Sequence, residues 1–354
     1  MALTHWIKRL FGRGGRHETA GVRKRGPATH VIILDGTMSS LIGGQETHAG
    51  QLYKLLQEAS DAAKLGANLT IYYEPGIQWT DWGATLDVMQ GRGINRQIKR
   101  AYGVLATRYR TGDRIVLAGY SRGAYAARSL AGVIDLVGLV KTGSATERNV
   151  QLAYRHYRRG GRGVAAEAFR KRHCHPSVEI EAVAVWDTVK ALGVRVPILW
   201  HWSAVEHQFH NHALGDSIKN GFHALALDET REAYTPVLWS CPPGWEGRME
   251  QVWFPGTHGD VGGQISGYEP ARPLANLSLV WMLERLERCG LPLPADWVAR
   301  FPTDPTAPSM GRWRGWSKMF FVRKARVVGR DPSETLHPSV ALRRPNDTKL
   351  AVPN

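Results

Sequence analysis

The chain has 354 residues, of which 43% are hydrophobic, and this is enough to bury one large core, with no composition typical of a disordered protein. Its three widely spaced cysteines, Cys174, Cys241 and Cys289, include no CxxC pair, which argues against a disulfide framework and against zinc or redox chemistry. The net charge of +15 is concentrated in residues 1–30, 151–175 and 301–330, each with seven Lys and Arg and one acidic residue, so a basic surface over the whole fold is excluded.

Residues 1–29 form a basic leader that we expect to lie outside the folded domain. It has no apolar run of signal-peptide length, and no later run is long enough to span a bilayer, so we expect a cytoplasmic protein, peripheral at a membrane, with specialised secretion left as an alternative. Aromatic side chains alternate with cations here and near residue 315, a pattern that suits a membrane interface. These aromatics are Trp6, Phe11, Trp313, Trp316, Phe320 and Phe321.

The first half of the folded region alternates between strands and helices. Apolar runs predict strands near residues 30–34, 69–74 and 114–120, and amphipathic patterns predict helices over 50–65, 94–109 and 122–138. Because parallel strands need right-handed crossovers, this order predicts a mostly parallel sheet with helices on both faces. The fold class is therefore α/β.

The second half is harder to interpret. We predict a basic helical insertion at about 140–175, a strand over 178–189, a helical lid over 190–235, a strand over 249–256, a loop at 258–263 and a helix over 276–290. The catalytic domain would then span 30–300, and the basic aromatic region 301–354 would pack on it or extend it.

Gly119, Ser121 and Gly123 form a GxSxG motif between the strand RIVLAG and the helix RGAYAARSLAGVI. This is the strand-turn-helix setting of a nucleophile elbow, in which the serine has a strained backbone and the glycines let strand and helix approach. The motif therefore predicts Ser121 as a nucleophile, with the backbone N–H of Arg122 at the helix N-terminus as an oxyanion donor.

A serine nucleophile needs a histidine base and an acid that orients it, and in this fold both follow the serine in the order acid, then histidine. Asp187 ends the apolar strand VEIEAVAVWD, and His258 follows the strand QVWFPG in a glycine-rich loop. They are the candidate acid and base. Asp260 competes with Asp187 for the orienting role, although capping of its own loop suits it better.

The turn Asp35-Gly36-Thr37 follows the first strand, where the second oxyanion donor of such sheets usually originates. Backbone N–H groups of Gly36 or Thr37 are the candidates, with Asp35 in a supporting position. The string LDGT also resembles the DxDGT of aspartate-dependent phosphatases, but the position of their nucleophile is occupied by Ile33, which excludes that mechanism.

Four histidines, His201, His207, His210 and His212, are dense enough to raise the question of a metal site. Their spacing fits no zinc signature and no acidic cluster accompanies them, so we expect neither a metal nor a cofactor.

Several segments resemble a family of bacterial and fungal α/β hydrolases of unknown function, similar to the catalytic domain of type VI secretion phospholipase effectors. These segments are LDGT at 34–37, YRTGDRIVLAGYSRGAYAARSLAG at 109–132, VAVWDTVKALG at 183–193, HALALDETR at 223–231 and QVWFPGTHGDVGG at 251–263. The resemblance implies Ser121 as nucleophile, Asp187 as acid and His258 as base, and hydrolysis of phospholipid esters. The chain departs from the family in having Tyr120 where Phe is frequent, and we expect no large appended membrane-binding domain.

The sequence thus predicts a serine esterase that forms an acyl-enzyme on Ser121, with phospholipid as the favoured substrate and an anionic membrane surface as a further contact. No nucleic-acid partner is expected, and the oligomeric state is left open. The alternative is a non-catalytic membrane-binding or nucleic-acid-binding module on a hydrolase scaffold, which would bind heparin in a salt-dependent way without reacting with a fluorophosphonate.

Overall fold

The computed structural model of the chain describes residues 26–63, 68–76, 92–189, 213–241, 244–311 and 322–345. Residues 1–25 of the basic leader, the four histidines between 201 and 212 and the aromatic run at 313–321 lie outside the described residues, so their predicted roles stay predictions. Residues 26–29 of the leader are described, and Thr29 already belongs to β1. In the described part no helix is long and apolar enough to cross a membrane.

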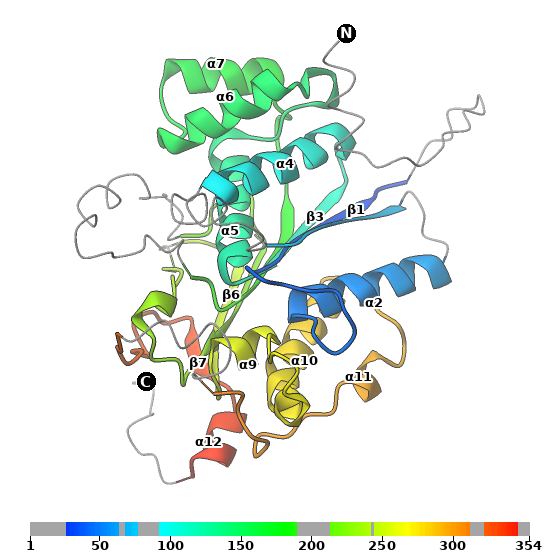
Figure 1. The fold of residues 1–354 in the computed structure, drawn as a ribbon. Helices are drawn as coiled ribbons and strands as arrows, with labels where there is room; N and C mark the ends of the chain where they lie inside the picture. The colour runs from blue at the N-terminus through cyan, green and yellow to red at the C-terminus, as the bar shows by residue number, and fades with distance from the viewer. Residues whose placement is uncertain are drawn as a thin grey trace.

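A seven-stranded sheet forms the centre of the molecule, with strand order β2-β1-β3-β4-β5-β6-β7 and parallel pairing throughout (Figure 1). Nearly continuous apolar runs form these strands, because a parallel sheet covered on both faces buries successive side chains. The strands are β1 (Thr29–Leu34), β2 (Leu69–Glu74), β3 (Arg114–Tyr120), β4 (Ile180–Trp186), β5 (Asn220–Ala226), β6 (Arg248–Phe254) and β7 (Glu334–Leu336).

Helices cover both faces of the sheet and separate the core into two main layers. Leu117 and Ile32 face a cluster that includes helices α4 (Arg92–Arg108) and α5 (Ser121–Val137). Val116 and Ile33 face a second cluster that includes α2 (His48–Ala62) and α10 (Arg272–Arg288). The predicted alternation of strands and helices from residue 30 to 138 is confirmed, and so is the helix predicted over 276–290.

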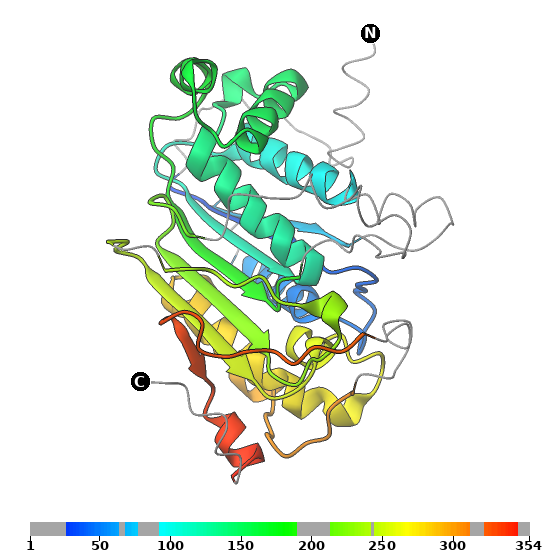
Figure 2. The same cartoon turned by 90° about the vertical axis from the view of Figure 1, so that its left-hand side faces the viewer.

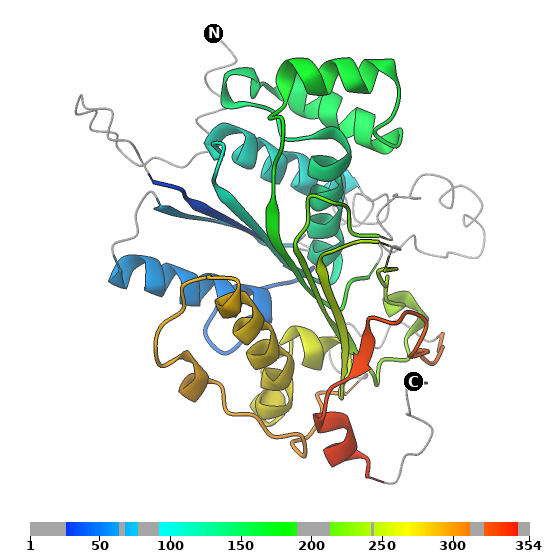
Figure 3. The same ribbon diagram turned by 180° about the vertical axis from the view of Figure 1, so that it is seen from behind.

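Shorter elements surround this framework. Figure 1 shows α6 (Glu147–Arg158) and α7 (Val164–His173) outside the layer made by α4 and α5. The other helices of the described ranges are η2 (Thr142–Ser144), η3 (Glu232–Tyr234), α9 (His258–Gly262), η4 (Glu269–Ala271), α11 (Trp297–Arg300) and α12 (Ser339–Arg343). In Figure 3 the red strand β7 lies at the edge of the sheet beside β6.

Two predictions about the second half of the chain are wrong. Residues 220–226, assigned to a lid, form β5, which lies between β4 and β6 in the sheet. Its histidine, His223, is fully buried, where it accepts a hydrogen bond from the Thr188 N–H at 3.1 Å and lies 3.4 Å from the Gln251 side chain. The stretch 258–263, predicted as a loop, contains the helix α9, which a capping box between Thr257 and Asp260 stabilises.

Candidate active site

Ser121 lies at a sharp turn between β3 and α5, and its backbone has the left-handed φ of 57°. Left-handed backbone is costly for residues other than glycine, so close packing must hold this turn. A Cβ on Gly123 would lie 2.1 Å from the Leu34 carbonyl oxygen, and one on Gly119 would lie 2.7 Å from the Gly123 carbonyl oxygen. The two glycines therefore let α5 approach β3 and β1 closely enough to present Ser121 at the strand end.

His258 and Asp187 lie beside this turn and complete a hydrogen-bonded chain of three side chains. The Ser121 Oγ lies 2.9 Å from His258 Nε2, and His258 Nδ1 lies 2.5 Å from Asp187 Oδ2. Because a carboxylate only accepts hydrogen bonds, the imidazole donates from Nδ1, which leaves the Nε2 lone pair facing the serine hydroxyl. The structure thus brings together the three residues that sequence reasoning selected from three separate strand ends.

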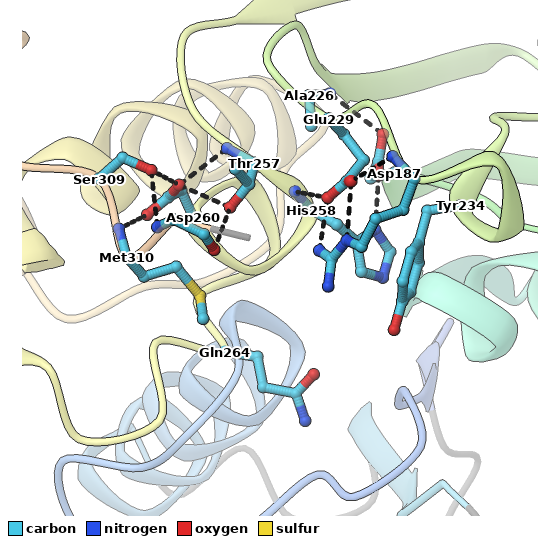
Figure 4. Close-up of polar contacts among 12 residues, drawn as sticks. Asp187, Ala226, Glu229, Tyr234, Thr257, His258, Asp260, Gln264, Ser309 and Met310 are labelled. Atoms are coloured by element: carbon cyan, nitrogen blue, oxygen red, sulfur yellow. Dashed lines mark hydrogen bonds and ion pairs between the residues drawn. The ribbon is translucent and has the colours of Figure 1, made fainter. Parts of the chain in front are cut away.

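Asp260 is directed at its own helix and at the chain beyond residue 300. Its carboxylate accepts from the backbone N–H of Thr257 and Met310, both at 2.7 Å, and from the hydroxyls of Thr257 at 2.8 Å and Ser309 at 2.5 Å. Figure 4 shows this group of contacts apart from the group around Asp187. Asp260 accordingly fixes the first turn of α9, which begins with His258.

Asp187 is completely buried, and four donors surround its carboxylate. Besides His258, the Arg326 guanidinium donates to Oδ1 at 2.5 Å and to Oδ2 at 2.9 Å, and the Ala226 N–H donates to Oδ1 at 3.0 Å. Burial alone would raise the pKa of Asp187, but the charge of Arg326 and the hydrogen bond from His258 hold that pKa far below its ordinary value. The acid is therefore ionised throughout the physiological pH range.

Two more charged side chains and two aromatic rings enclose His258. Its backbone N–H donates to Glu229 Oε2 at 3.2 Å, and Glu229 forms a buried ion pair with Arg231 at 2.5 Å. The rings of Tyr120 and Tyr234 pack against the imidazole with centroid distances of 4.9 Å and 4.6 Å. Burial lowers the pKa of His258 below its ordinary value, although the Asp187 carboxylate acts in the opposite direction, so the neutral form predominates at pH 7.

The hydroxyl of Tyr120 forms hydrogen bonds that a phenylalanine could not form. It donates to the His258 carbonyl oxygen at 3.2 Å and lies 3.4 Å from Gln264 Oε1. The tyrosine thus connects β3 to the beginning of α9 and to the residue just beyond its end, which a phenylalanine at this position would not do.

Among the oxyanion candidates, the turn after β1 is tightly organised by Asp35. This carboxylate accepts from the Gly36 N–H and the Thr47 hydroxyl at 2.6 Å and from the Tyr73 hydroxyl at 2.7 Å. Burial raises the pKa of Asp35 to about 6, against the effect of these hydrogen bonds. Because the Gly36 N–H is already engaged, the N–H of Thr37 becomes the better candidate on this side, opposite that of Arg122 in the first turn of α5.

Sequence reasoning missed three contributors to this site: Glu229, Tyr234 and Arg326. Glu229 lies in the segment HALALDETR that carried part of the family resemblance, but no pattern gave it a role. Arg326 lies in a basic segment, where nothing in the sequence separates it from six other cations. Within the described ranges no group of three or more His, Cys, Asp and Glu side chains could hold a metal ion.

A family model matches most of the chain. The model described as type VI secretion system phospholipase effector Tle1-like, catalytic domain, matches residues 29–285. This range contains Ser121, Asp187 and His258, and it ends before Arg326.

Individual proteins are more distantly similar. The uncharacterized protein YEL023C of Saccharomyces cerevisiae is 27% identical over 268 residues, which are 65% of this chain and 38% of the yeast protein. A crystal structure of an uncharacterized Pseudomonas aeruginosa protein is 15% identical, covering 83% of this chain and 51% of that chain, with a TM-score of 0.41. The Tle1 effector bound to the VgrG spike from the type 6 secretion system is 18% identical, covering 72% of this chain and 55% of that chain, with a TM-score of 0.35. The chain thus spans little more than half the length of either solved protein, and less of the yeast protein.

Proposed function

Because this chain belongs to the family of Tle1-like phospholipase effector catalytic domains, we propose that it is a serine hydrolase that cleaves phospholipid carboxylic esters through an acyl-enzyme on Ser121. The observation that carries the proposal is the continuous hydrogen-bonded chain from the Ser121 hydroxyl through His258 to the buried carboxylate of Asp187. A serine hydroxyl is a poor nucleophile at neutral pH, and this chain supplies what activates it.

In the proposed reaction the Ser121 oxygen bonds to the carbonyl carbon of the ester while its proton moves to His258 Nε2. Collapse of the tetrahedral intermediate breaks the bond to the leaving alcohol, which takes the proton from His258. Water then attacks the acyl-enzyme, His258 accepts one of its protons, and the fatty acid leaves as that proton returns to Ser121. Asp187 stabilises the imidazolium present in both halves and keeps the imidazole in the required tautomer.

The negative charge of each tetrahedral intermediate needs donors that are in place before reaction. We assign this role to the backbone N–H groups of Arg122 and Thr37, which flank Ser121 from α5 and from the turn after β1. Gly36 supports this assignment, because a Cβ there would lie 2.8 Å from the Tyr120 ring and 3.2 Å from the Ser121 Cβ. The turn that carries Thr37 is therefore packed directly against the serine.

Phospholipid is the proposed substrate class because the family is described as phospholipase effectors. Exposed cations of residues 151–175, on α6, on α7 and in the turn between them, are our candidates for contact with an anionic lipid surface. They are Arg155, Arg158, Arg159, Arg162, Arg170, Lys171 and Arg172.

The proposal is tested by replacing Ser121 with alanine and measuring turnover of p-nitrophenyl esters and of phospholipid vesicles side by side. We expect a fall in kcat of roughly 10⁵-fold or more with both substrates, because nucleophile and base act as a unit. Ser129→Ala, which removes a buried hydroxyl from the same helix, is the control. Undiminished turnover by Ser121→Ala, or fluorophosphonate labelling at another residue, would contradict the proposal.

A further inference from the structure

Arg326 reaches the site from a part of the chain that the family model does not match. Its side chain is only 3% exposed, yet its neighbours Val322 and Val327 on the same segment are 64% and 51% exposed. In Figure 2 the orange-red segment before β7 runs across the sheet near the strand ends. The segment thus lies on the surface and sends one guanidinium inward.

Backbone contacts hold this segment at its beginning. The Lys324 N–H donates to the Thr230 carbonyl at 2.7 Å, the Glu232 N–H donates to the Val322 carbonyl at 3.0 Å, and Arg231 and Arg323 form an isolated antiparallel bridge. The segment is therefore attached to the stretch that runs from the end of β5 through η3, which also carries Glu229 and Tyr234.

The Arg326 guanidinium joins three parts of the site. It donates to both oxygens of Asp187 after β4, to the Ala226 carbonyl at the end of β5 at 2.7 Å, and to the Tyr234 carbonyl in η3 at 2.6 Å. Two parallel hydrogen bonds from the guanidinium hold the carboxylate plane more firmly than the single contacts with His258 and the Ala226 N–H would alone. Through the Tyr234 carbonyl the same group fixes the residue whose ring packs against His258.

We propose that Arg326 is a positioning residue for the hydrolysis, and that the segment 322–327 is a strap that carries it into the active site to fix Asp187 and, through it, His258. This inference rests on the proposed function. In this role Arg326 holds Asp187 in place before the reaction begins. A small displacement of Asp187 would misalign the imidazole of His258 and lower the rate, although every reacting group would still be present.

The charge of Arg326 should also affect how the reaction rate depends on pH, because it acts on the pKa of His258. The groups around His258 are Asp187 after β4, Glu229 and Arg231 after β5, Tyr234 in η3, Tyr120 and Ser121 at the end of β3, and Arg326 itself. Burial and, to a smaller extent, the cationic Arg326 lower the pKa of His258, whereas Asp187 and Glu229 raise it. Removing the guanidinium must therefore raise the pKa of His258. Since the neutral imidazole is the base, the acidic limb of the rate profile must move to higher pH.

The experiment compares Arg326→Gln with the wild type and with Lys324→Gln, which removes the same charge from an exposed side chain on the same segment. The readouts are kcat/KM for a p-nitrophenyl ester and the rate of fluorophosphonate labelling of Ser121, both measured across pH. For Arg326→Gln we expect a fall of about 10²-fold in both rates and an acidic limb displaced to higher pH. We expect Lys324→Gln to match the wild type in both respects.

The inference is overturned if Arg326→Gln has the rate and acidic limb of Lys324→Gln, or if its loss of rate is equal at every pH. Should Arg326→Gln fail to fold, Arg326→Lys replaces it. The lysine keeps the positive charge, so the acidic limb should stay at its pH, but it cannot form the two parallel hydrogen bonds to Asp187. A kcat unchanged from the wild type would then overturn the inference. Absence of labelling in the wild type would instead contradict the proposed function.

Discussion

Ser121 and Asp187 both have left-handed backbones, with φ of 57° and 40°, but the molecule holds them by different means. Main-chain packing around Gly119 and Gly123 holds Ser121, and the contacts come from β1, the turn after it, β3 and α5. Charged side chains hold Asp187 and His258, and the bonded partner Arg326 is 139 residues away from Asp187 in the sequence. The nucleophile side, around Ser121, depends on glycines whose missing Cβ atoms allow close backbone packing. The acid and base side, around Asp187 and His258, depends on ion pairs between segments far apart in the sequence.

This difference determines how each side should respond to substitution. On the acid and base side, replacing one charged side chain leaves a buried charge without its partner, and this lowers the stability of the fold by several kcal/mol. On the nucleophile side the backbone conformation itself stores the strain, at about 1–3 kcal/mol per residue.

On the acid and base side, the largest effect is expected for Asp187→Asn, which removes the charge of the acid itself. The amide either presents a donor to His258 and Arg326 or favours the wrong imidazole tautomer, so kcat should fall by about 10⁴-fold while Ser121 and its oxyanion donors stay in place. Steady-state turnover of a soluble ester measures the effect. Asp296→Asn, the same substitution at an exposed ion pair, is the control and should leave kcat unchanged. Retention of more than a tenth of the wild-type kcat by Asp187→Asn would show that another acid orients His258.

A smaller effect, on stability, is expected for Asp260→Asn. Its carboxylate accepts four hydrogen bonds that fix α9 to the chain near Ser309, and an amide can accept only at its oxygen. We expect the free energy of unfolding to fall by about 2–3 kcal/mol, as measured by urea denaturation. The exposed Asp216→Asn should change it little. An equal loss in both variants would mean that Asp260 does not anchor the helix.

The same contrast explains how much of the fold and site the sequence could predict. The run from β1 to α5 was predictable because its apolar strands and amphipathic helices follow one another regularly, and because the constraints on Ser121 are local enough to appear as GxSxG. Asp187 and His258 could be selected because each follows an apolar strand.

What the sequence did not reveal are pairings between polar groups far apart in the chain. The strand β5 was missed because His223 interrupts its apolar pattern, and only the fold supplies the Thr188 N–H and Gln251 near it. Three glycines made α9 look like a loop, but Gly259 and Gly262 are needed for close contact, since Cβ atoms there would lie 2.2 Å from the Met310 sulfur and 1.9 Å from the Tyr120 ring. The role of Arg326 depends on a bonded partner that no local pattern identifies.

The smallest effect is expected on the nucleophile side, and it is the difference in stability between Ser121→Gly and Ser121→Ala. Both variants lack the hydroxyl, so their difference isolates the left-handed backbone, and we expect the glycine variant to be more stable by about 1 kcal/mol. At Ser129, inside the same helix, the order should reverse, because glycine destabilises an ordinary helical position by about 1 kcal/mol relative to alanine. Chemical denaturation of the four variants measures both differences. Glycine less stable than alanine at both positions would mean that the turn at Ser121 stores no strain, and that packing alone presents the serine.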